Sequence, residues 1–556
     1  MTKIKPALFL CSILFIATIV KAQSIDDGKK FFYYEKYISA KNVFDKLIAA
    51  NPNDVDIAYW LGQTEIQLAD TVSAQALYQK TLMANSNSAL LIAGIGHIEL
   101  LQGQATDARS RFETAISLSN SKNAAVLNAI GLANVQAKNG DASYAIDKLN
   151  MAIALKDGAK NPDIYCNLGD ANKKMGNGGG AQTAYQTALS VQHNYARASL
   201  KIGKIYQTQG YTQQDVFMKY YNDAIAEDPN YAPVYYTLYD YFYTTDVTKS
   251  GQYLEQYLTL KGDDEPNACY YRASMKYAQG LFNDAVTQSN SCISASATPT
   301  PSLYGLKAYA YFRLGDSLDA KSSFETYFAK QMPGKVGSTD YVTYGRVLLK
   351  LGTADTALAS AAINKGLALD AGESDKVTHL RSIATDYQNA KAYKQAGDYY
   401  NKIVAVKANP TKTDLYNAGY SYFRDGAYKE AIGVFTIYTQ KFPDDAFGFY
   451  MMGKSYWGID STMQKGLANP SFQKAIDVGM ADTAKYKQQL IGSYKYFVPY
   501  YVNVKRDKQT ALDYCDKILA LDPTDAQALS NKEVISKLNL KPVATKKAPP
   551  ATGNTQ

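Results

Sequence analysis

Residues 413–446 read TDLYNAGYSYFRDGAYKEAIGVFTIYTQKFPDDA. Within this stretch Ala431 follows Gly419 by twelve residues, Phe435 follows Ala431 by four, and Pro443 stands near the end. Apolar residues recur every three to four positions on both sides of a central Asp-Gly turn signal, which predicts two amphipathic helices of about a dozen residues each. The small residues fit where two helices cross closely, the aromatic ring projects between neighbouring helix pairs, and the proline starts the next unit.

The same unit recurs along the chain at a fixed step of 34 residues. The positions that keep this step are Gly28, Gly62 and Gly96, then Ala40, Ala74 and Ala108, then Phe44, Tyr78 and Phe112. A single helical hairpin cannot bury its apolar face alone, so a constant repeat of this length predicts stacked hairpins that share one continuous core.

On these residues the chain resembles the tetratricopeptide repeat (TPR) family over residues 23–540. The resemblance implies an all-α fold, a right-handed superhelical solenoid of about 14 antiparallel helical hairpins. The better repeats are residues 24–232 and 380–445, and the pattern is degenerate around residues 233–262, where Tyr239 replaces the expected small residue. A solenoid needs an end with a polar outer face, so we expect a final capping helix near residue 526.

Both ends of the chain differ in composition from the repeats. Residues 1–22 place Lys3 and Lys5 before an apolar run, Ala7–Val20, and predict a secretory signal peptide that is removed. An uncleaved anchor is the alternative, but a spanning helix needs about 20 apolar residues and this run is shorter. Residues 541–556 are rich in Pro, Ala and Lys and predict a disordered tail. We therefore expect an exported protein, periplasmic or associated with an outer membrane.

Charge and residue usage exclude several functional classes. The formal charge is +8, but six of the lysines lie in the two terminal segments, which leaves +8 − 6 = +2 for the repeats and argues against a nucleic-acid surface. Three scattered histidines do not suggest a metal cluster. No paired nucleophile and base stands out, so we expect no enzyme activity, no metal and no cofactor.

Two motifs have simple structural interpretations. Residues 448–455 satisfy the phosphate-loop pattern G-x-x-x-x-G-K-S, but Gly453 lies 34 residues after Gly419 and so falls inside a predicted helix. Amides bonded within a helix cannot surround a phosphate. The acidic cluster Asp263-Asp264-Glu265 lacks the alternating ligands of a calcium loop, and we interpret it as a solvated helix start.

Cys269 and Cys292 fall near the start of one predicted helix and the end of its antiparallel partner. Antiparallel packing brings those two helix ends together, and an exported chain meets oxidising conditions. The sequence leaves two alternatives for Cys269 and Cys292, a disulfide or a pair of buried free thiols.

Tyrosine is unusually frequent, 47 of 556 residues, and most of these rings are expected to fill space between hairpins. The family resemblance implies that first helices line a concave surface, on which positions −3, +1, +4 and +5 from the small residue share one face. From residue 268 to residue 460 this face is rich in aromatic and cationic residues: Tyr270, Tyr277, Tyr309, Phe312, Arg313, Arg346, Lys350, Tyr416, Tyr420, Phe423, Arg424, Tyr450, Lys454 and Trp457. The matching positions of the early hairpins, such as Gln63, are less cationic.

These observations predict a scaffold or adaptor of the cell envelope that binds an acidic segment of a partner protein in the groove. The alternative is a glycan-binding protein of the envelope that uses aromatic platforms on the same groove. Only Trp60 and Trp457 are present as tryptophans, which weakens that alternative. No nucleic-acid partner and no transmembrane segment after signal cleavage are expected.

Overall fold

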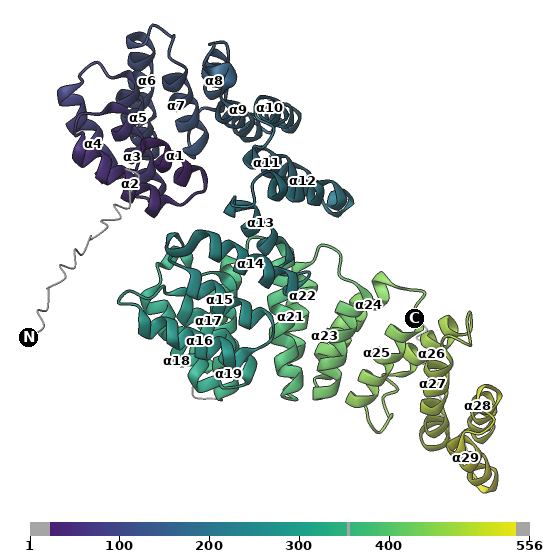
Figure 1. The fold of residues 1–556 in the computed structure, drawn as a ribbon. Coiled ribbons are helices and arrows are strands. Elements are labelled where there is room, and N and C mark those ends of the chain that lie inside the picture. Colours follow the sequence, from purple (N-terminus) through teal and green to yellow (C-terminus); the bar gives the residue numbers. More distant parts are fainter. Residues whose placement is uncertain (1–22, 353–355, 541–556) are drawn as a thin grey trace, which may run out of the picture. The chain divides into compact units, whose positions relative to one another are not determined.

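The computed structural model describes residues 23–352 and 356–540, and every regular element in these ranges is helical (Figure 1). Helices α1 to α28 of this described part follow one another as 14 consecutive pairs, and α29 (Ala526–Lys537) follows as a single helix. The predicted all-α solenoid of helical hairpins is confirmed. The chain divides into two compact units, Met1–Leu303 and Tyr304–Gln556, which we call unit 1 and unit 2.

Unit 1 contains eight of the helix pairs found in the described residues. The first helices are α1 (Ile25–Tyr33), α3 (Val55–Gln67), α5 (Ala89–Leu101), α7 (Ala124–Gln136), α9 (Pro162–Lys174), α11 (Ala196–Gln207), α13 (Ala232–Phe242) and α15 (Ala268–Ala278). The second helices are α2 (Tyr37–Ala50), α4 (Thr71–Ala84), α6 (Ala105–Leu118), α8 (Ala142–Ile153), α10 (Gly178–Val191), α12 (Gln214–Glu227), α14 (Val247–Lys261) and α16 (Phe282–Ala295).

Unit 2 continues the same alternation. Its first helices are α17 (Ser302–Leu314), which begins at the boundary, α19 (Ser338–Leu351), α21 (Glu373–Asn389), α23 (Lys412–Asp425), α25 (Ala446–Ile459) and α27 (Lys487–Tyr500). Its second helices are α18 (Ser317–Lys330), α20 (Thr356–Leu369), α22 (Tyr393–Val406), α24 (Tyr428–Lys441), α26 (Asn469–Gly479) and α28 (Lys508–Leu521).

Polar side chains fix where many of these helices begin. Asp54 and Asp141 precede α3 and α8, and each carboxylate accepts a hydrogen bond from the amide three residues later. Such N-caps satisfy an amide that has no partner inside the helix. At the other end, Gly426 follows α23 with φ of 84°, a backbone conformation that favours glycine, and its amide returns to the last turn. Short turns of this kind keep the paired helices antiparallel.

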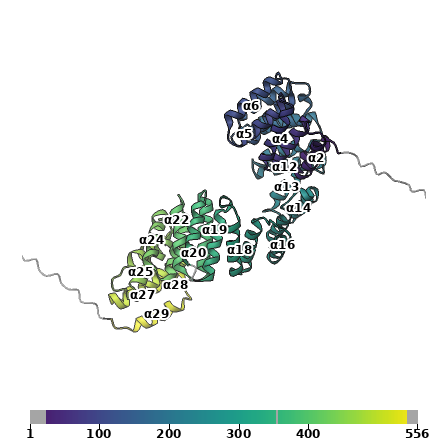
Figure 2. The same ribbon diagram turned by 90° about the vertical axis from the view of Figure 1, so that its left-hand side faces the viewer.

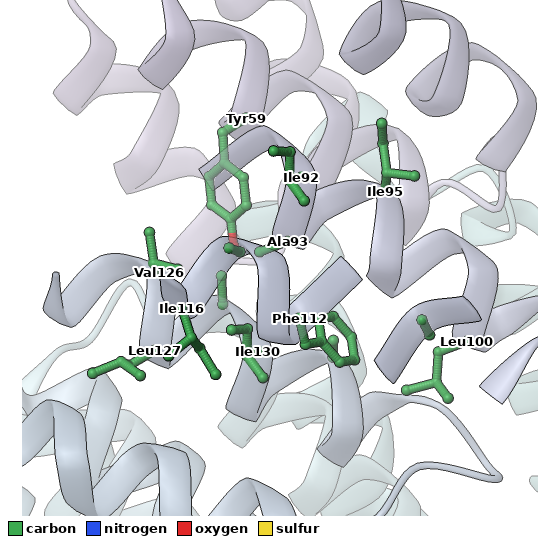
Figure 3. Packing of buried hydrophobic residues seen from close by; sticks show 14 of the residues in the cluster. Tyr59, Ile92, Ala93, Ile95, Leu100, Phe112, Ile116, Val126, Leu127 and Ile130 are labelled. Atoms are coloured by element: carbon green, nitrogen blue, oxygen red, sulfur yellow. The ribbon is translucent and has the colours of Figure 1, made fainter. Parts of the chain in front are cut away.

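The repeated glycines lie under the repeated aromatic rings. A Cβ atom added at Gly62 would lie 2.3 Å from Tyr78, and one added at Gly28 would lie 2.4 Å from Phe44. Tyr78 also covers Gly94 in the next hairpin. The ring therefore packs on its own hairpin and on the following one, which is how the 34-residue spacing produces a continuous core. Figure 3 shows part of that core, where Phe112 and Ile116 of α6 face Val126 and Ile130 of α7.

The pattern expected to be degenerate, residues 233–262, still forms the regular pair α13 and α14. Tyr239, which takes the place of the small residue, is buried at 7% exposure among other rings. Its ring contacts Tyr243 and Tyr271 edge to face. The aromatic cluster replaces the close glycine contact, so the helices pack without the usual small residue.

The first hairpin of unit 1 contacts residues between 231 and 264, far along the chain. The backbone amide of Ser39 donates to Asp264 at 2.8 Å, and the Lys261 ammonium donates to the carbonyl of Glu35. The ring of Tyr33 lies 5.1 Å from that of Tyr231. Figure 2 draws α2 near α14, in agreement with the bonds to Lys261 and Asp264. We call this set of contacts the closure contact.

The closure contact changes the interpretation of the acidic cluster at residues 263–265. Asp264 is not a solvated helix start, because it accepts hydrogen bonds from both the amide and the hydroxyl of Ser39. Glu265 accepts a hydrogen bond from the hydroxyl of Tyr257. These two carboxylates therefore contribute to the packing of unit 1, and the distant partner of Asp264 is not marked by any pattern in the sequence.

Several predictions concern segments that the structure leaves undescribed. The predicted signal peptide, residues 1–22, and the predicted tail, residues 541–556, lie outside the described residues. Among the helices that are described, none combines the length and the apolar character that a bilayer span requires.

Candidate functional site

A cavity of about 790 Å³ lies in unit 1 and is lined mainly by first helices. The closure contact places the first hairpin against one side of it, through residues such as Lys29, Phe32 and Tyr37, while α9 and α11 supply the opposite side. Its lining mixes aromatic rings, amide side chains and charged groups. Cavities of about 300–1,000 Å³ with a few convergent polar groups are typical of ligand sites.

One helix position contributes to the cavity in five successive hairpins. Each of these first helices carries one glycine at the repeated small-residue position, and the residue six positions before that glycine lines the cavity. These residues are Asp56, Leu90, Ala125, Asp163 and Arg197. Positions −3 and +1 add Tyr59, Gln63 and Asn128. The face chosen from the sequence included −3 and +1 but not −6. If position −6 of the early hairpins had been included in this face, Asp163 and Arg197 would have been predicted to line the groove.

The charged groups of the cavity bind one another. Arg197 donates to Asp163 at 2.7 Å and to Asp170 at 3.3 Å, and Lys201 donates to Asp170 at 2.8 Å. Burial opposes ionisation of Asp170, but the charges of Lys201 and Arg197 outweigh it and hold the pKa of that carboxyl below its ordinary value. The hydroxyl of Tyr185 also donates to Asp170 at 2.7 Å. The two positive and two negative charges of this network nearly cancel, and the hydrogen bonds hold the side chains in place along one wall of the cavity.

Amide side chains extend this wall across the cavity. Asn167 accepts from Arg197 at 2.8 Å and donates to Asn128 at 2.8 Å. Gln67 of α3 donates to Gln136 of α7 at 3.4 Å. Gln63 is 2% exposed and donates to the hydroxyl of Tyr78, but its Oε1 atom has no hydrogen-bond donor among the described residues. An unsatisfied buried acceptor is costly, so Gln63 lowers the stability of this part of the wall.

Aromatic rings cover the part of the cavity near α1 and α3. Phe32 and Tyr59 both meet Trp60 edge to face, at ring-centroid distances of 5.3 Å and 5.8 Å. The Lys29 ammonium lies 5.5 Å from the centre of the Trp60 ring. These contacts hold the indole in place, and preorganised rings offer contact area at low entropic cost.

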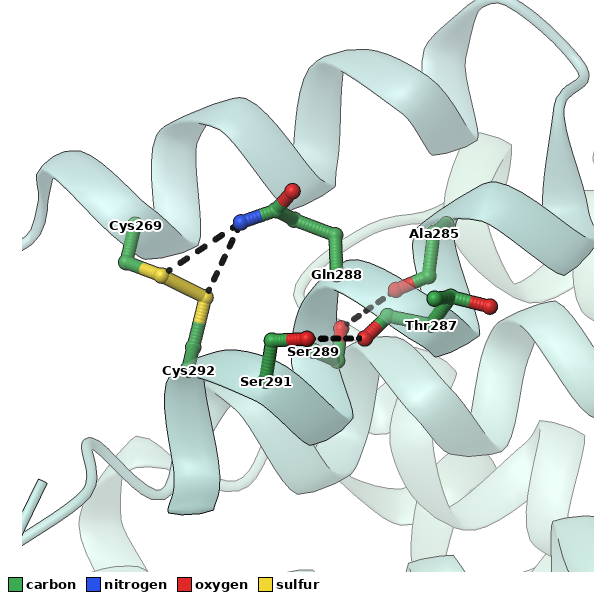
Figure 4. Close-up of a disulfide and its surroundings, with 7 residues drawn as sticks. All are labelled: Cys269, Ala285, Thr287, Gln288, Ser289, Ser291 and Cys292. Atoms are coloured by element: carbon green, nitrogen blue, oxygen red, sulfur yellow. Dashed lines mark hydrogen bonds between the residues drawn. A yellow bond between two sulfur atoms is a disulfide. The ribbon is translucent and has the colours of Figure 1, made fainter. Parts of the chain in front are cut away.

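The residues predicted as partner-binding in unit 1 lie on α15. Tyr270 contacts Tyr271 at a centroid distance of 5.9 Å, and Tyr277 packs on Phe282 at 5.3 Å. Neither ring lines the cavity described above. Cys269 of this helix is joined to Cys292 of α16 by a disulfide, with a Cα–Cα distance of 5.9 Å (Figure 4). The side-chain amide of Gln288 lies 3.6 Å from both sulfur atoms.

In unit 2, the predicted residues on α17 and α19 form a first group. Phe312 lies beneath two cations, Arg346 at 5.0 Å and Lys350 at 4.4 Å. Arg346 also forms an ion pair with Asp386 at 2.6 Å. Tyr309 donates its hydroxyl to Asp340 at 2.6 Å, which gives it a structural partner. Arg313 is exposed at the end of α17.

A second group of predicted residues lies on α23 and α25. The rings of Tyr416 and Tyr420 stack at 5.2 Å, and Tyr420 stacks on Phe423 at 6.3 Å. Arg424 lies 4.1 Å from the centre of the Tyr393 ring, and Lys454 lies 4.9 Å from that of Phe423. The structure thus assembles a surface of stacked rings and cations, which we call the α23–α25 surface. Trp457 lies outside it and packs edge to face on Tyr496 at 5.5 Å.

Two other motifs have no ligand-binding geometry in the structure. Residues 448–455, with the phosphate-loop pattern, lie within α25, and a Cβ atom at Gly453 would lie 2.9 Å from Phe472. This segment is helical core, as expected. Within residues 23–352 and 356–540, no group of three or more His, Cys, Asp or Glu side chains is arranged to hold a metal ion.

Comparison with known proteins gives a family match inside unit 1. The tetratricopeptide repeat family model matches residues 162–195, which span α9, α10 and the turn that follows. A comparison with curated proteins gives no match.

Several solved structures are similar to this chain. The C-terminal part of a TPR repeat-containing protein from Cytophaga hutchinsonii is 26% identical, with 47% of this chain and 98% of that chain covered and a TM-score of 0.34. A tetratricopeptide repeat protein from Parabacteroides merdae is 19% identical, with 44% and 93% covered and a TM-score of 0.35. Yeast Tom70 is 13% identical, with 73% and 95% covered and a TM-score of 0.35.

Proposed function

Because this chain is a member of the tetratricopeptide repeat family, whose members are generally non-catalytic scaffolds for protein–protein interactions, we propose that it is an exported scaffold of the cell envelope. It holds a partner protein through an acidic segment that docks on the α23–α25 surface. The envelope location rests on the composition of residues 1–22.

One observation carries the partner-binding part of this proposal. Lys350, Arg424 and Lys454 lie over aromatic rings, and none of them forms an ion pair with a carboxylate in the part of the chain that the structure describes. Elsewhere in unit 2 the cations Arg346 and Lys412 do find carboxylates, Asp386 and Asp445. Of these, Arg424 and Lys454 belong to the α23–α25 surface and therefore remain available to a partner there.

The environment of these cations favours a carboxylate ligand. Burial lowers the pKa of Lys454, so its charged form is under-solvated where it lies. A carboxylate brought next to Lys454 and Arg424 would supply the missing counter-charge and charge-assisted hydrogen bonds. The neighbouring rings of Tyr416, Tyr420 and Phe423 would bury the apolar part of the same segment.

Charge reversal tests the proposal. The double variant Arg424→Glu/Lys454→Glu is used to capture partners from an envelope extract, beside the unchanged protein. The matched control is Lys429→Glu/Lys474→Glu, which makes the same change in net charge at exposed positions on the second helices α24 and α26. We expect the first variant to lose the captured partner and the control to retain it.

The ionic strength of the extract provides a second measurement. Capture through exposed ion pairs weakens as salt screens the charges, so the partner recovered at 0.5 M salt should fall well below that at 0.05 M. Equal recovery by the unchanged protein and by Arg424→Glu/Lys454→Glu at both salt concentrations would contradict docking on this surface.

A further inference from the structure

We propose that the cavity of unit 1 is a second binding site, and that its ligand is a short, neutral oligosaccharide. This inference goes beyond the proposed function, because it uses other residues and another class of ligand. It rests on the size of the cavity, on the ion pairs of Arg197 and Lys201, and on the amide and carboxylate groups of the lining.

The cavity, which we call the chamber, is partly open and is bounded on one side by the first hairpin. The closure contact joins this hairpin to α14 and to the turn after it, through Lys261 to the carbonyl of Glu35 and through Ser39 to Asp264. Tyr33, which lines the cavity from α1, packs on Tyr231 at 5.1 Å. A volume of about 790 Å³ suits a compact ligand of a few sugar units.

Two of the three cations that line the chamber form ion pairs. Arg197 and Lys201 bind Asp163 and Asp170 at distances of 2.7–3.3 Å. The third, Lys29, lies over Trp60 at the opposite side. A ligand carboxylate at Arg197 would have to displace Asp163 or Asp170, so this side of the chamber disfavours an acidic ligand.

Amide and carboxylate groups make up much of the polar lining of the chamber. Glu35 and Asp56 add two further carboxylates to the lining, and no ion pair to either carboxylate occurs among the described residues. The amides of Gln67 and Asn128 can both donate and accept. A wall of this composition suits a ligand whose polar groups can both donate and accept hydrogen bonds.

Sugar hydroxyls meet this need because each hydroxyl donates one hydrogen bond and accepts others. A peptide main chain offers a single N–H group per residue, and that group is spaced along an extended chain. The apolar C–H face of a pyranose ring can also pack on an aromatic side chain, and the partly exposed Trp60 lines the cavity. The chemistry of the wall therefore favours a saccharide over a peptide.

Tryptophan fluorescence allows a test at the site itself. Trp60 and Trp457 are the two tryptophans of the sequence, so the variant Trp457→Phe leaves Trp60 as the single reporter beside the cavity. This protein is titrated with neutral oligosaccharides of two to six units, drawn from glucans, mannans, xylans and galactans, and binding is measured by calorimetry in parallel. We expect at least one of them to bind saturably and to shift the Trp60 emission.

Substitutions in the wall identify the groups that bind. Gln67→Ala and Asn128→Ala should each weaken binding about tenfold, because each removes hydrogen bonds to the ligand. The control Gln75→Ala removes a glutamine on α4 that pairs with Gln102 outside the cavity, and it should bind with unchanged affinity. Circular dichroism and the unfolding midpoint of each variant establish that the fold is retained.

Several results would overturn the proposal. They are the absence of binding by every oligosaccharide in the panel, binding that leaves the Trp60 emission unchanged, and equal binding by Gln67→Ala, Asn128→Ala and Gln75→Ala. Tighter binding of a polyamine or of an acidic peptide at Trp60 would show that the ligand class is wrong. The variant Arg424→Glu/Lys454→Glu changes only unit 2 and should still bind the oligosaccharide. This result separates the chamber from the site proposed on unit 2.

Discussion

Replacing Gly419 by alanine adds a methyl group where the structure leaves no room. A Cβ atom at this position of α23 would lie 2.7 Å from Cζ and 2.8 Å from Cε1 of Phe435. Phe435 has no exposed surface, so its ring cannot turn away into solvent. The backbone of the hairpin must move apart instead, which weakens packing on both sides of the ring.

Two opposing effects decide how much the replacement of a helical glycine by alanine changes the free energy of unfolding. Alanine is more favourable than glycine inside a helix by about 1 kcal/mol. Overpacking in a well-packed core costs about 1–3 kcal/mol. At Gly433 in the paired helix α24, no atom lies within 4 Å of an added Cβ. Alanine there should therefore gain the helix preference without the cost of overpacking. We expect Gly433→Ala to be stabilised by about 1 kcal/mol, and Gly419→Ala to be about 1–3 kcal/mol less stable than Gly433→Ala.

Urea unfolding followed by circular dichroism compares the two variants with the unchanged protein. Because a repeat protein does not have to unfold in one step, hydrogen exchange of peptides from residues 412–441 is measured in parallel. Exchange of this hairpin should be faster in Gly419→Ala and slower in Gly433→Ala. If Gly419→Ala proved as stable as Gly433→Ala, the idea that glycine is required by ring contact would be refuted.

Three further predictions concern unit 1. Digestion without reductant should yield one peptide pair linked through Cys269 and Cys292. For a loop of this length, the chain-entropy model predicts that the disulfide stabilises the fold by about 3 kcal/mol. A Cys292→Ala variant that unfolds at the same urea concentration as the unchanged protein would contradict this value. Burial lowers the pKa of His97 to about 4, so the unfolded state binds the proton more tightly and stability should fall as the pH drops from about 6.5 to 4. Urea midpoints at these two values should differ more for the unchanged protein than for His97→Leu, and equal differences would refute the assignment. Ser39→Ala removes the hydroxyl bond to Asp264, and hydrogen exchange of α1 and α2 should accelerate while that of α5 and α6 stays unchanged.

The repeat was predictable from the sequence because its determinants are local. Gly28 and Phe44, or Gly419 and Phe435, lie sixteen residues apart, and their spacing alone places a ring over a glycine in a helical hairpin. The segment around Tyr239 was harder, because a cluster of rings substitutes for the small residue and spacing does not reveal such a replacement.

The candidate sites were predictable only in part. Stacking of Tyr416, Tyr420 and Phe423 follows from their positions on one helix face. The pairing of Arg346 with Asp386 was missed, because the carboxylate comes from the next hairpin at a position that the pattern does not mark. The partner-binding roles of these residues stay predictions.

The chamber of unit 1 was missed for a different reason. Arg197 and Asp163 occupy position −6, which the chosen helix face omitted. More fundamentally, the chamber depends on the bond from Ser39 to Asp264, which joins residues 225 positions apart. Contacts of such long sequence separation leave no periodic signal, since each partner is unremarkable within its own repeat.

The closure contact has a consequence for how the protein is made. Most packing in a helical repeat array is between neighbours, so each hairpin can fold as soon as the next one has emerged. The first hairpin is an exception, because Glu35 and Ser39 find their partners only after residue 264 has been synthesised. Until then its aromatic side chains, Tyr33 among them, stay without their final neighbours and are available to chaperones or to misfolding. The earliest part of unit 1 to be synthesised is thus completed only after the six hairpins from α3 to α14 have followed it.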